Sequence, residues 1–387
     1  MSDFFHTVII GAGASGLFCA GSFSERKLVL EGNKKPALKV SVSGGGKCNF
    51  TNAYASAADY VCTQKHFCKS ALSAFGPKDF IQLLQQNSID FEERPGGQFF
   101  GKNAADLVRF LVRRAQQNNT QIELNTRVLG VQKTPSGFTV LTSRGKVETS
   151  HVVLACGGIS FPALGASNFG VQTAQKFGLK IVPQRPALCG LLWPKEYAFL
   201  GALTGNAVPA RVSCGKHAFE NALLFTHDGI SGPAVLNTSL FWDENKPVSV
   251  NFLPSVNALD FLRAHKTTKQ TVSQALSGEI SPKITRALLG ELDVRLPDIS
   301  KDFLLRAAAR LNAFTFIPAR TSGYTKAEVT AGGVDTTQIN PSTMEVKSVP
   351  GIYIIGELLD VTGRLGGFNL QWAWSSGAAA AKALDTF

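Results

Sequence analysis

The stretch VIIGAGASGL, residues 8–17, decides the fold. It begins inside the apolar run 4–10, which predicts a buried strand, and it continues into a predicted helix over 17–24. Between strand and helix, three glycines follow the spacing GxGxxG, which allows a tight turn, close approach of a pyrophosphate and close helix–strand packing. These glycines are Gly11, Gly13 and Gly16. The stretch therefore predicts the first turn of a dinucleotide-binding Rossmann fold.

The chain after this turn supplies an acid that such a site needs. A second predicted strand, Lys27 to Leu30, ends at Glu31, which lies 20 residues after Gly11. A carboxylate at this position hydrogen-bonds the ribose of a bound dinucleotide. The free amides at the start of the helix, near Ala14 and Ser15, can bind its phosphates. We predict that all of these residues contact the cofactor.

Length and composition describe a globular, basic protein. The 387 residues predict two or three domains, and 44% hydrophobic against 17% charged residues suffices for a core. The net charge of +11 favours a polyanionic partner or substrate. Seven cysteines, an odd number, show no zinc spacing, so we expect reduced thiols and no metal site.

The N-terminus and the hydropathy pattern indicate a cytoplasmic protein. The segment MSDFFHTVII leads directly into the first strand and shows no signal-peptide pattern. No apolar run approaches the length of about 18 residues that a membrane helix needs. We therefore expect no membrane partner.

Shifts in composition divide the chain into four segments and predict an α/β protein. A β-rich segment with many prolines, read as an inserted domain, and then a helical segment follow the first Rossmann-like part. The predicted boundaries are 1–182 for the Rossmann-like part, 183–256 for the β-rich insertion, 257–322 for the helical domain and 323–387 for the C-terminal segment.

Patterns within the Rossmann-like segments predict its other elements. Amphipathic periodicity indicates helices over 77–87 and 103–118, and a helix follows the glycines at 366–367. Short β-rich runs indicate strands at 122–124, 127–132, 138–143, 146–149, 151–155 and 352–355.

A second glycine–acid pair far along the chain favours FAD over NAD as the bound dinucleotide. The stretch IYIIGELLD, 352–360, places Gly356 and Glu357 after an apolar strand, where the glycine admits the pyrophosphate and the acid accepts hydrogen bonds from the ribitol chain. Ala155 and Gly157, in ACGG at another strand end, are expected beside them. No second GxGxxG is present, so NAD(P)H is expected to bind only transiently as reductant.

The glycine-rich stretch SVSGGGKCNFTN, residues 41–52, is not a Walker A loop. That loop needs Gly, four residues and then Gly-Lys-Ser/Thr, whereas Cys48 follows Lys47 and Ser41 stands at the earlier glycine position. Another function must explain three consecutive glycines.

Five motifs, in this order, resemble the BaiN/RdsA family of NAD(P)/FAD-dependent oxidoreductases over essentially the whole chain. They are VIIGAGASGL, SGGGKCNFTN, FTHDGISGPAVL, AEVTAGGV and GGFNLQWAWSSG. The resemblance implies an FAD-binding Rossmann domain, an inserted β-barrel-like domain and a helical domain, and it implies that the C-terminal segment 323–387 returns to complete the FAD-binding domain. It also implies reduction of steroid-type enones or of uracil in ribosomal RNA.

The resemblance makes the glycine-rich stretch a second cofactor loop. It implies that backbone and polar side chains there approach the flavin, with Lys39 and Lys47 facing phosphates or an anionic substrate. The first residues of the last helix are expected to bind the flavin pyrimidine oxygen through their amides, and Val128 is a further expected contact. The expected residues of these segments are Lys39, Gly44, Gly45, Gly46, Asn49, Thr51, Asn52, Gly366, Gly367, Phe368 and Asn369.

Some positions depart from the family pattern. Lys47 stands where arginine is usual, so a charge remains but a bidentate fork is lost. Ala37-Leu38 replaces Gly-Arg, and Gln98 and Gly101 replace arginine and proline. The segment 164–170 has fewer hydroxyls than usual. These departures leave the substrate open.

Reduction of a conjugated C=C bond by a flavin needs a proton donor besides the cofactor. Cys48 and His227 are the catalytic candidates, although Cys48 also fits a buried packing role and His227 a structural role. Asp228 fits a helix-capping role. Trp372 and Trp374 fit packing of the last helix better than base stacking.

The sequence thus predicts an FAD-dependent oxidoreductase that uses NAD(P)H to reduce a conjugated C=C bond. The leading substrate is uracil in ribosomal RNA, reduced to dihydrouridine, because family and positive charge agree. Two alternatives stay open: a small-molecule flavin oxidase or enone reductase, and an RNA-binding flavoprotein with structural FAD. Ribosomal RNA or another anionic substrate is the expected partner, and the oligomeric state is left open.

Overall fold

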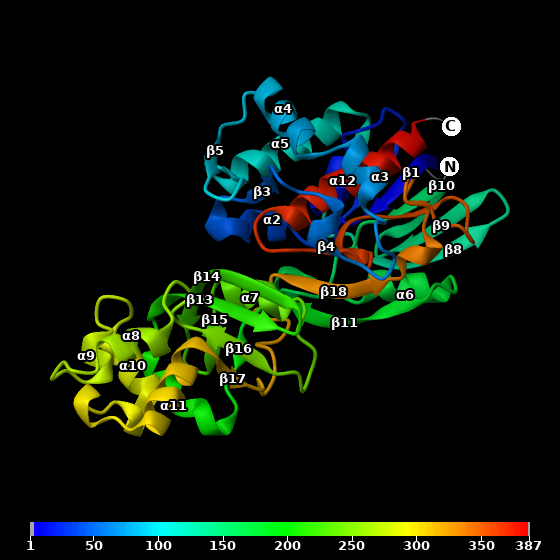
Figure 1. Cartoon of the computed structure of the whole chain (residues 1–387). Helices are drawn as coiled ribbons and strands as arrows, with labels where there is room; N and C mark the ends of the chain where they lie inside the picture. Colours follow the sequence, from blue (N-terminus) through cyan, green and yellow to red (C-terminus); the bar gives the residue numbers. More distant parts are fainter. Residues whose placement is uncertain (1–3, 386–387) are drawn as a thin grey trace. The chain divides into compact units, whose positions relative to one another are not determined.

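The computed structural model describes residues 4–385 and divides them into two compact units. Unit 1 comprises residues 4–185 and 329–385, so it contains both the blue and the red parts of the chain in Figure 1. Unit 2 comprises residues 186–328. Each unit encloses its own hydrophobic core, and each is described by itself.

The main sheet of unit 1 has seven strands: β1 (Phe4–Ile10), β2 (Lys27–Leu30), β7 (Thr120–Glu123), β8 (Val128–Thr134), β9 (Gly137–Thr142), β10 (Gly145–Leu154) and β19 (Ile352–Ile354). Their order is β7-β2-β1-β10-β9-β8, and β19 also pairs with β10. The pairs among β7, β2, β1, β10 and β19 are parallel. Strands buried on both faces read as continuous apolar runs, as residues 8–10 of β1 and all of β19 do.

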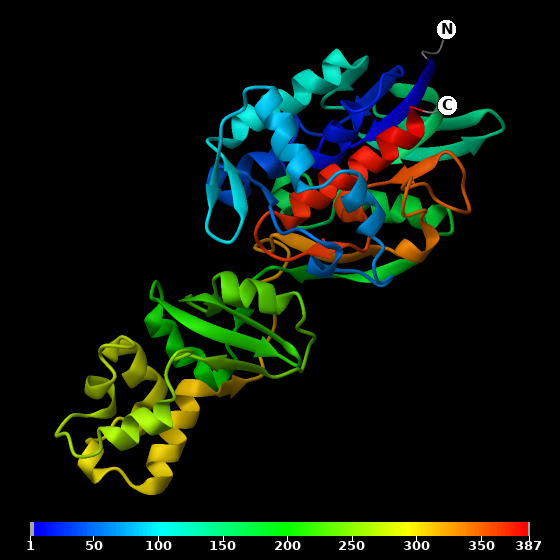
Figure 2. The same ribbon diagram turned by 45° about the horizontal axis from the view of Figure 1, so that its top comes forward.

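Seven helices belong to unit 1: α1 (Ala14–Ala20), α2 (Leu38–Val42), α3 (Lys69–Ala74), α4 (Pro77–Gln86), α5 (Ala104–Gln117), α6 (Phe169–Lys176) and α12 (Phe368–Leu384). Figures 1 and 2 show the red α12 beside the blue β1–α1 segment. The two helices approach closely at Gly377, where an added Cβ would lie 2.9 Å from the Ser15 carbonyl oxygen. The absence of a side chain at this position therefore sets the packing of α12 on α1.

Three smaller sheets complete unit 1: β3 (Asn49–Asn52) with β6 (Gln98–Gly101) and β5 (Phe91–Arg94), β4 (Tyr60–Val61) with β20 (Thr362–Gly363), and β11 (Ile181–Ala187) with β18 (Val329–Val334). β11 runs two residues into unit 2.

Short 3-10 helices occur in both units: η1 (Ser43–Gly46), η2 (Ala57–Asp59), η3 (Pro162–Leu164), η4 (Lys195–Leu203), η5 (Gly290–Leu292), η6 (Leu296–Asp298), η7 (Thr336–Gln338) and η8 (Gly356–Leu358).

Two expectations for unit 1 are wrong in detail. The strands predicted at 146–149 and 151–155 form the single strand β10, which pairs with β9 over its first half and with β1 and β19 further on. Because β10 changes partners midway, its two halves have different burial and look like two strands in the sequence. The polar segment 49–52 is the strand β3 and not a loop, since it pairs with β6.

Unit 2 contains a six-stranded antiparallel sheet of β12 (Leu191–Leu192), β15 (Gly229–Ser231), β14 (His217–Phe225), β13 (Ala207–Cys214), β16 (Val248–Asn251) and β17 (Phe314–Phe316), in this order. Its helices are α7 (Pro233–Ser239), α8 (Ala258–Ala264), α9 (Val272–Ala275), α10 (Pro282–Leu289) and α11 (Lys301–Asn312).

The β-rich and helical segments of unit 2 share one core. Val250 and Phe252 from the sheet side belong to the same buried cluster as Leu262, Leu288 and Leu311 from the helices. The sequence prediction treated these segments as two domains, because one is rich in β-formers and the other shows helical periodicity. Figure 2 shows the yellow helices at one end of the green sheet.

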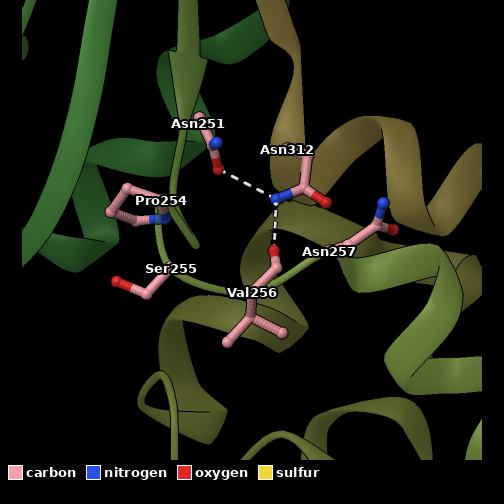
Figure 3. Close-up of a pocket in the computed structure, with 6 residues that line it drawn as sticks. All are labelled: Asn251, Pro254, Ser255, Val256, Asn257 and Asn312. Carbon is pink, nitrogen blue, oxygen red and sulfur yellow. Dashed lines mark hydrogen bonds between the residues drawn. The ribbon is translucent and has the colours of Figure 1, made fainter.

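A cluster of amides joins the strand β16 to the helices of unit 2. Asn312, the last residue of α11, donates Nδ2 to Asn251 Oδ1 at 2.9 Å and to the Val256 carbonyl at 3.0 Å (Figure 3). Its Oδ1 accepts from the Ala258 amide at 2.7 Å. A hollow of about 340 Å³ lies beside these groups, and Pro254, Ser255 and Asn257 complete its lining. The bonds of Asn312 to Asn251 and Val256 give the side-chain amides a structural role there.

Among residues 4–385, the helices are all too short or too polar to cross a bilayer.

A buried lysine in β2 predicts a distinctive pH dependence. Lys27 is fully buried and donates Nζ to the carbonyls of Phe23 and Asn118, and burial lowers the pKa of its ammonium to about 8. The unfolded chain therefore binds this proton up to about pH 10.5, and the folded chain releases it near pH 8. The free energy of unfolding should rise by roughly 1–3 kcal/mol across this window because of Lys27.

The comparison of wild type with Lys27→Met by urea unfolding at pH 7, 9 and 10.5 measures this contribution. The stability difference between the two proteins should move in favour of wild type as pH rises. Lys69→Met, at an exposed position of α3, is the matched control and should show no such change. A constant difference between wild type and Lys27→Met at all three pH values would contradict the prediction.

Candidate functional site

The parallel strands of unit 1 end at one edge of the sheet. Ile10 is paired with Leu30 of β2 and with Leu154 of β10, and Leu154 is paired with Ile354 of β19. Ligands of open α/β sheets bind outside such carboxyl ends, where neighbouring connections run to opposite sides. The predicted site residues that follow these strand ends are Gly11, Glu31, Ala155, Gly157, Gly356 and Glu357.

The three motif glycines have different surroundings. Gly11 has φ +112°, and a Cβ there would lie 2.5 Å from the Ala155 carbonyl oxygen. A Cβ at Gly16 would lie 2.0 Å from the Gly11 carbonyl oxygen, so these two glycines permit the turn and its packing. A Cβ at Gly13 would meet no atom within 4 Å. Gly13 therefore borders open space in which a ligand phosphate can approach the backbone.

The distant glycine–acid pair lies directly against the first motif. A Cβ at Gly356, which has φ +68°, would lie 2.6 Å from Ser15 Oγ. The Gly356 amide donates to Ser376 Oγ at 3.0 Å, and its carbonyl accepts from Trp372 Nε1 at 3.1 Å. The segments around residues 15 and 356 thus form one site, held together by α12.

Glu31 is fixed at the end of β2. Its Oε2 accepts from the Ala12 amide at 3.0 Å, and its Oε1 accepts from the amide and the Nδ2 of Asn33 at 2.9 Å. Asn33 Nδ2 also donates to the Leu164 carbonyl at 3.2 Å. The bonds from Ala12 and Asn33 orient the Glu31 carboxylate beside the glycine turn, where a ribose-binding acid is required.

Val128, another predicted cofactor contact, is half-buried at the first residue of β8.

Two predicted cofactor residues bind each other. Lys39 Nζ donates to Glu357 Oε2 at 2.7 Å and to Oε1 at 3.0 Å, and Oε1 also accepts from the Thr330 amide at 2.8 Å. A Cβ at Gly158 would lie 2.7 Å from Glu357 Oε1. Thr330 is a partner that the sequence analysis missed, since it stands 27 residues from Glu357 in a different motif.

The glycine-rich loop has a left-handed backbone and is open at Gly45 and Gly46. Gly44, Gly45 and Gly46 have φ values of +56°, +68° and +83°, a region that only glycine adopts freely. A Cβ at Gly45 or Gly46 would meet no atom within 4 Å. Lys47 is half exposed and lies 3.5 Å from Glu92 on β5. The loop backbone, rather than the Lys47 charge alone, is thus the part that a ligand can approach.

Strand β3 packs against the start of α12. Thr51 is fully buried and donates Oγ1 to Gln371 Oε1, so its side chain is committed to the protein interior. A Cβ at Gly367 would lie 2.3 Å from the Thr51 carbonyl oxygen. Asn52 Nδ2 donates to the Gly366 carbonyl at 3.0 Å. These contacts bring the glycine-rich stretch and the last motif together.

The first turn of α12 offers backbone groups only. Gly366 and Gly367 have φ values of +118° and +96°. Asn369 bonds the amide and the carbonyl of Gly363 with its own side chain, both at 2.9 Å, and the Phe368 ring is buried. The expected ligand contacts of Phe368 and Asn369 are therefore contacts of their backbone amides.

The two catalytic candidates have contrasting environments. Cys48 is fully buried with φ +58°, and burial raises the pKa of its thiol to about 12. These properties fit the packing role. His227 is exposed in the turn between β14 and β15 of unit 2, and Asp228 beside it accepts from Thr226 Oγ1 at 3.3 Å.

Trp372 and Trp374 are both buried and donate their indole N–H groups to the carbonyls of Gly356 and Phe50. The expectation that they pack the last helix is confirmed.

The fold and this strand-end arrangement define an α/β protein of the Rossmann class, as predicted, and the structure divides it into two compact units. The chain belongs to the family described as HI0933-like protein Rossmann domain, whose model matches residues 5–383. The predicted resemblance to the BaiN/RdsA family is confirmed.

Curated relatives and solved structures resemble the chain over nearly its full length. Ribosomal RNA dihydrouridine synthase of Escherichia coli (strain K12) is 40% identical over 98% of both chains. The protein of the same name from Haemophilus influenzae (strain ATCC 51907 / DSM 11121 / KW20 / Rd) is 37% identical over 100% of both. The 3-dehydro-bile acid delta(4,6)-reductase of Clostridium scindens (strain ATCC 35704 / DSM 5676 / VPI 13733 / 19) is 29% identical over 97% of this chain and 98% of its own.

A solved quinol–fumarate reductase shares the fold at a TM-score of 0.52 and 14% identity, over 100% of this chain and 71% of its own. The names of the curated relatives, a synthase and a reductase, agree with the predicted enzyme class.

Proposed function

We propose that the protein is an FAD-dependent reductase that converts uracil in ribosomal RNA to dihydrouridine, with NAD(P)H as the reductant. The observation that carries the cofactor is the contact of Gly356 with Ser15 at the shared edge of four parallel strands. A long dinucleotide needs both segments in one place. The RNA substrate is supported by the two full-length relatives named for it and by the net charge of +11.

The residues at this edge fit FAD. Gly13 and Gly157 border open space, as do Gly45 and Gly46 of the glycine-rich loop. The Asn49 Oδ1 atom is buried and, within the described residues, has no hydrogen-bond partner. A site that leaves open glycine backbone and an unsatisfied acceptor fits a ligand with phosphates and hydrogen-bonding ring edges.

Each group of residues has a proposed task. The backbone at Gly11–Gly16 holds the pyrophosphate, Glu31 accepts from the ribose, and the amides at the start of α12 bind the flavin ring. Lys39 and Glu357 hold each other beside the cofactor position. Bound FAD supplies hydride transfer, which the side chains of the protein do not provide.

The net positive charge serves the RNA substrate. The excess of lysine and arginine attracts the RNA backbone, and the reacting uracil must leave its stack to reach a flavin.

Cys48 does not fit the role of proton donor to the substrate. It keeps its proton because burial raises the pKa of its thiol, and full burial separates it from solvent. We therefore do not assign the proton donor to Cys48.

A small-molecule enone reductase is the second candidate. The similarity to the bile acid reductase, 29% identity over 97% of the chain, favours it. Both candidate functions are the reduction of a C=C bond conjugated to a carbonyl. They therefore share the same flavin chemistry and differ in the substrate that binds at the flavin.

Two measurements test the proposal. Purified protein should show a flavin spectrum that bleaches anaerobically on addition of NADH or NADPH. Disruption of the gene should remove a dihydrouridine from ribosomal RNA in nucleoside mass spectra, and the intact gene on a plasmid should restore it. Unchanged nucleoside spectra together with rapid turnover of a steroid enone would reject the RNA substrate in favour of the second candidate.

A further inference from the structure

A hydrogen-bonded pair of side chains on the small β3–β6 sheet lies beside the start of α12. Asn49 and Gln98 come from neighbouring strands, whose register shifts between Asn49 and Thr51. Asn49 Nδ2 donates to Gln98 Oε1 at 2.7 Å. The Gln98 side chain also contacts the turn before α12, because a Cβ at Gly366 would lie 3.4 Å from Gln98 Cδ.

This bond fixes the direction of the Asn49 amide. With Nδ2 engaged by Gln98, the Oδ1 atom is buried and has no partner among the described residues. The position of a Cβ on Gly367 would be 2.8 Å from Asn49 Oδ1, so this acceptor lies next to the residue that precedes α12. A buried carbonyl oxygen without a donor is costly, and its presence points to a ligand that supplies one.

Donors lie next to this acceptor. The first N–H groups of any helix lack intrahelical partners, and no side chain caps α12 at Gly367. Positive φ values at Gly366 and Gly367 give the chain the turn that leads into α12. The site thus offers an acceptor and backbone donors side by side.

We propose that Gln98 is a positioning residue, which turns the Asn49 amide so that Asn49 Oδ1 and the first N–H groups of α12 recognise the N–H and C=O of one imide edge. The proposal rests on the proposed function, which assigns the first amides of α12 to the flavin ring. The flavin pyrimidine ring and the uracil base both carry an imide edge, and a uracil edge would assign these amides to the substrate instead. A hydrogen-bond acceptor beside a hydrogen-bond donor complements the adjacent N–H and C=O groups of either ring. Gln98 acts through Asn49 and need not contact the ligand.

The test compares Gln98→Leu with Gln98→Glu in the FAD-loaded protein. The leucine removes the acceptor for Asn49 Nδ2, whereas the glutamate keeps one. If the edge belongs to the flavin, Gln98→Leu should weaken FAD binding about tenfold and shift the flavin absorbance band, with the KM for ribosomal RNA unchanged. If it belongs to uracil, FAD binding should stay and the KM for RNA should rise about tenfold. Gln98→Glu should recover most of either effect.

A double variant separates positioning from general packing. Adding Gln98→Leu to Asn49→Leu should change neither FAD binding nor KM beyond the Asn49→Leu variant alone. Gln172→Leu, on the exposed face of α6, controls for the substitution itself, and thermal unfolding reports folding of every variant.

Two results would overturn the inference. One is a Gln98→Leu protein within twofold of wild type in both FAD binding and KM. The other is a double variant whose FAD affinity is much lower, or whose KM for RNA is much higher, than that of Asn49→Leu. In both cases a wild type that binds FAD and forms dihydrouridine leaves the proposed function intact, whereas a wild type that does neither removes both.

Discussion

Replacing Gly13 by valine is expected to give a folded protein that carries no FAD. Gly13 has φ −83° and ψ −166°, which valine adopts without strain, and its added Cβ would meet no protein atom within 4 Å. The isopropyl group would instead fill the space left for the pyrophosphate. We expect FAD affinity to fall more than about a hundredfold, or about 3 kcal/mol, while stability changes by less than about 1 kcal/mol. Flavin absorbance per protein and urea unfolding measure the two quantities.

Gly278→Val is the matched control for this substitution. Gly278 lies in unit 2, is exposed, and also has no atom within 4 Å of an added Cβ. This variant should retain full FAD. Gly11→Ala should behave differently from both, because its Cβ would press on the Ala155 carbonyl oxygen and destabilise the turn itself. A Gly13→Val protein with one FAD per chain would show that the cofactor does not pass this glycine.

Local patterns were sufficient to predict the first turn of unit 1 and its distant partner. Gly11 and Gly16 follow from spacing, since each allows a backbone approach that no other residue permits. Gly356 follows from its apolar strand and the acid after it. β19 lies beside β10 because parallel strands bury apolar runs, and this pairing brings Gly356 to Ser15.

Side-chain partners between distant segments could not be predicted in this way. Lys39 and Glu357 are 318 residues apart and each looks like an independent ligand contact in the sequence. Their ion pair depends on how β19 and α2 are placed by the whole sheet. The polar segment 49–52 looked like a ligand loop for a similar reason, because its strand pairing with β6 depends on residues about 50 positions away.

Replacing Trp374 by alanine is expected to destabilise unit 1 by about 3–5 kcal/mol. The Trp374 ring is fully buried, stacks on Phe80 with ring centres 4.6 Å apart, and lies 5.6 Å from Phe18. Its Nε1 donates to the Phe50 carbonyl at 2.8 Å. Alanine would leave a large cavity between α12, α1 and α4 and an unpaired buried carbonyl, and urea unfolding should show the loss directly.

Trp374→Phe separates the two parts of this effect. Phenylalanine keeps most of the ring contact with Phe80 but removes the N–H donor, so we expect a loss of about 1–3 kcal/mol. Phe199→Ala, at a 58% exposed ring in unit 2, should change stability by less than about 0.5 kcal/mol. If Trp374 served to stack on a base instead, Trp374→Ala would keep its stability and lose only RNA binding. Its burial next to Phe80 excludes that result, because a ring enclosed by α12 and α4 has no face left for a ligand.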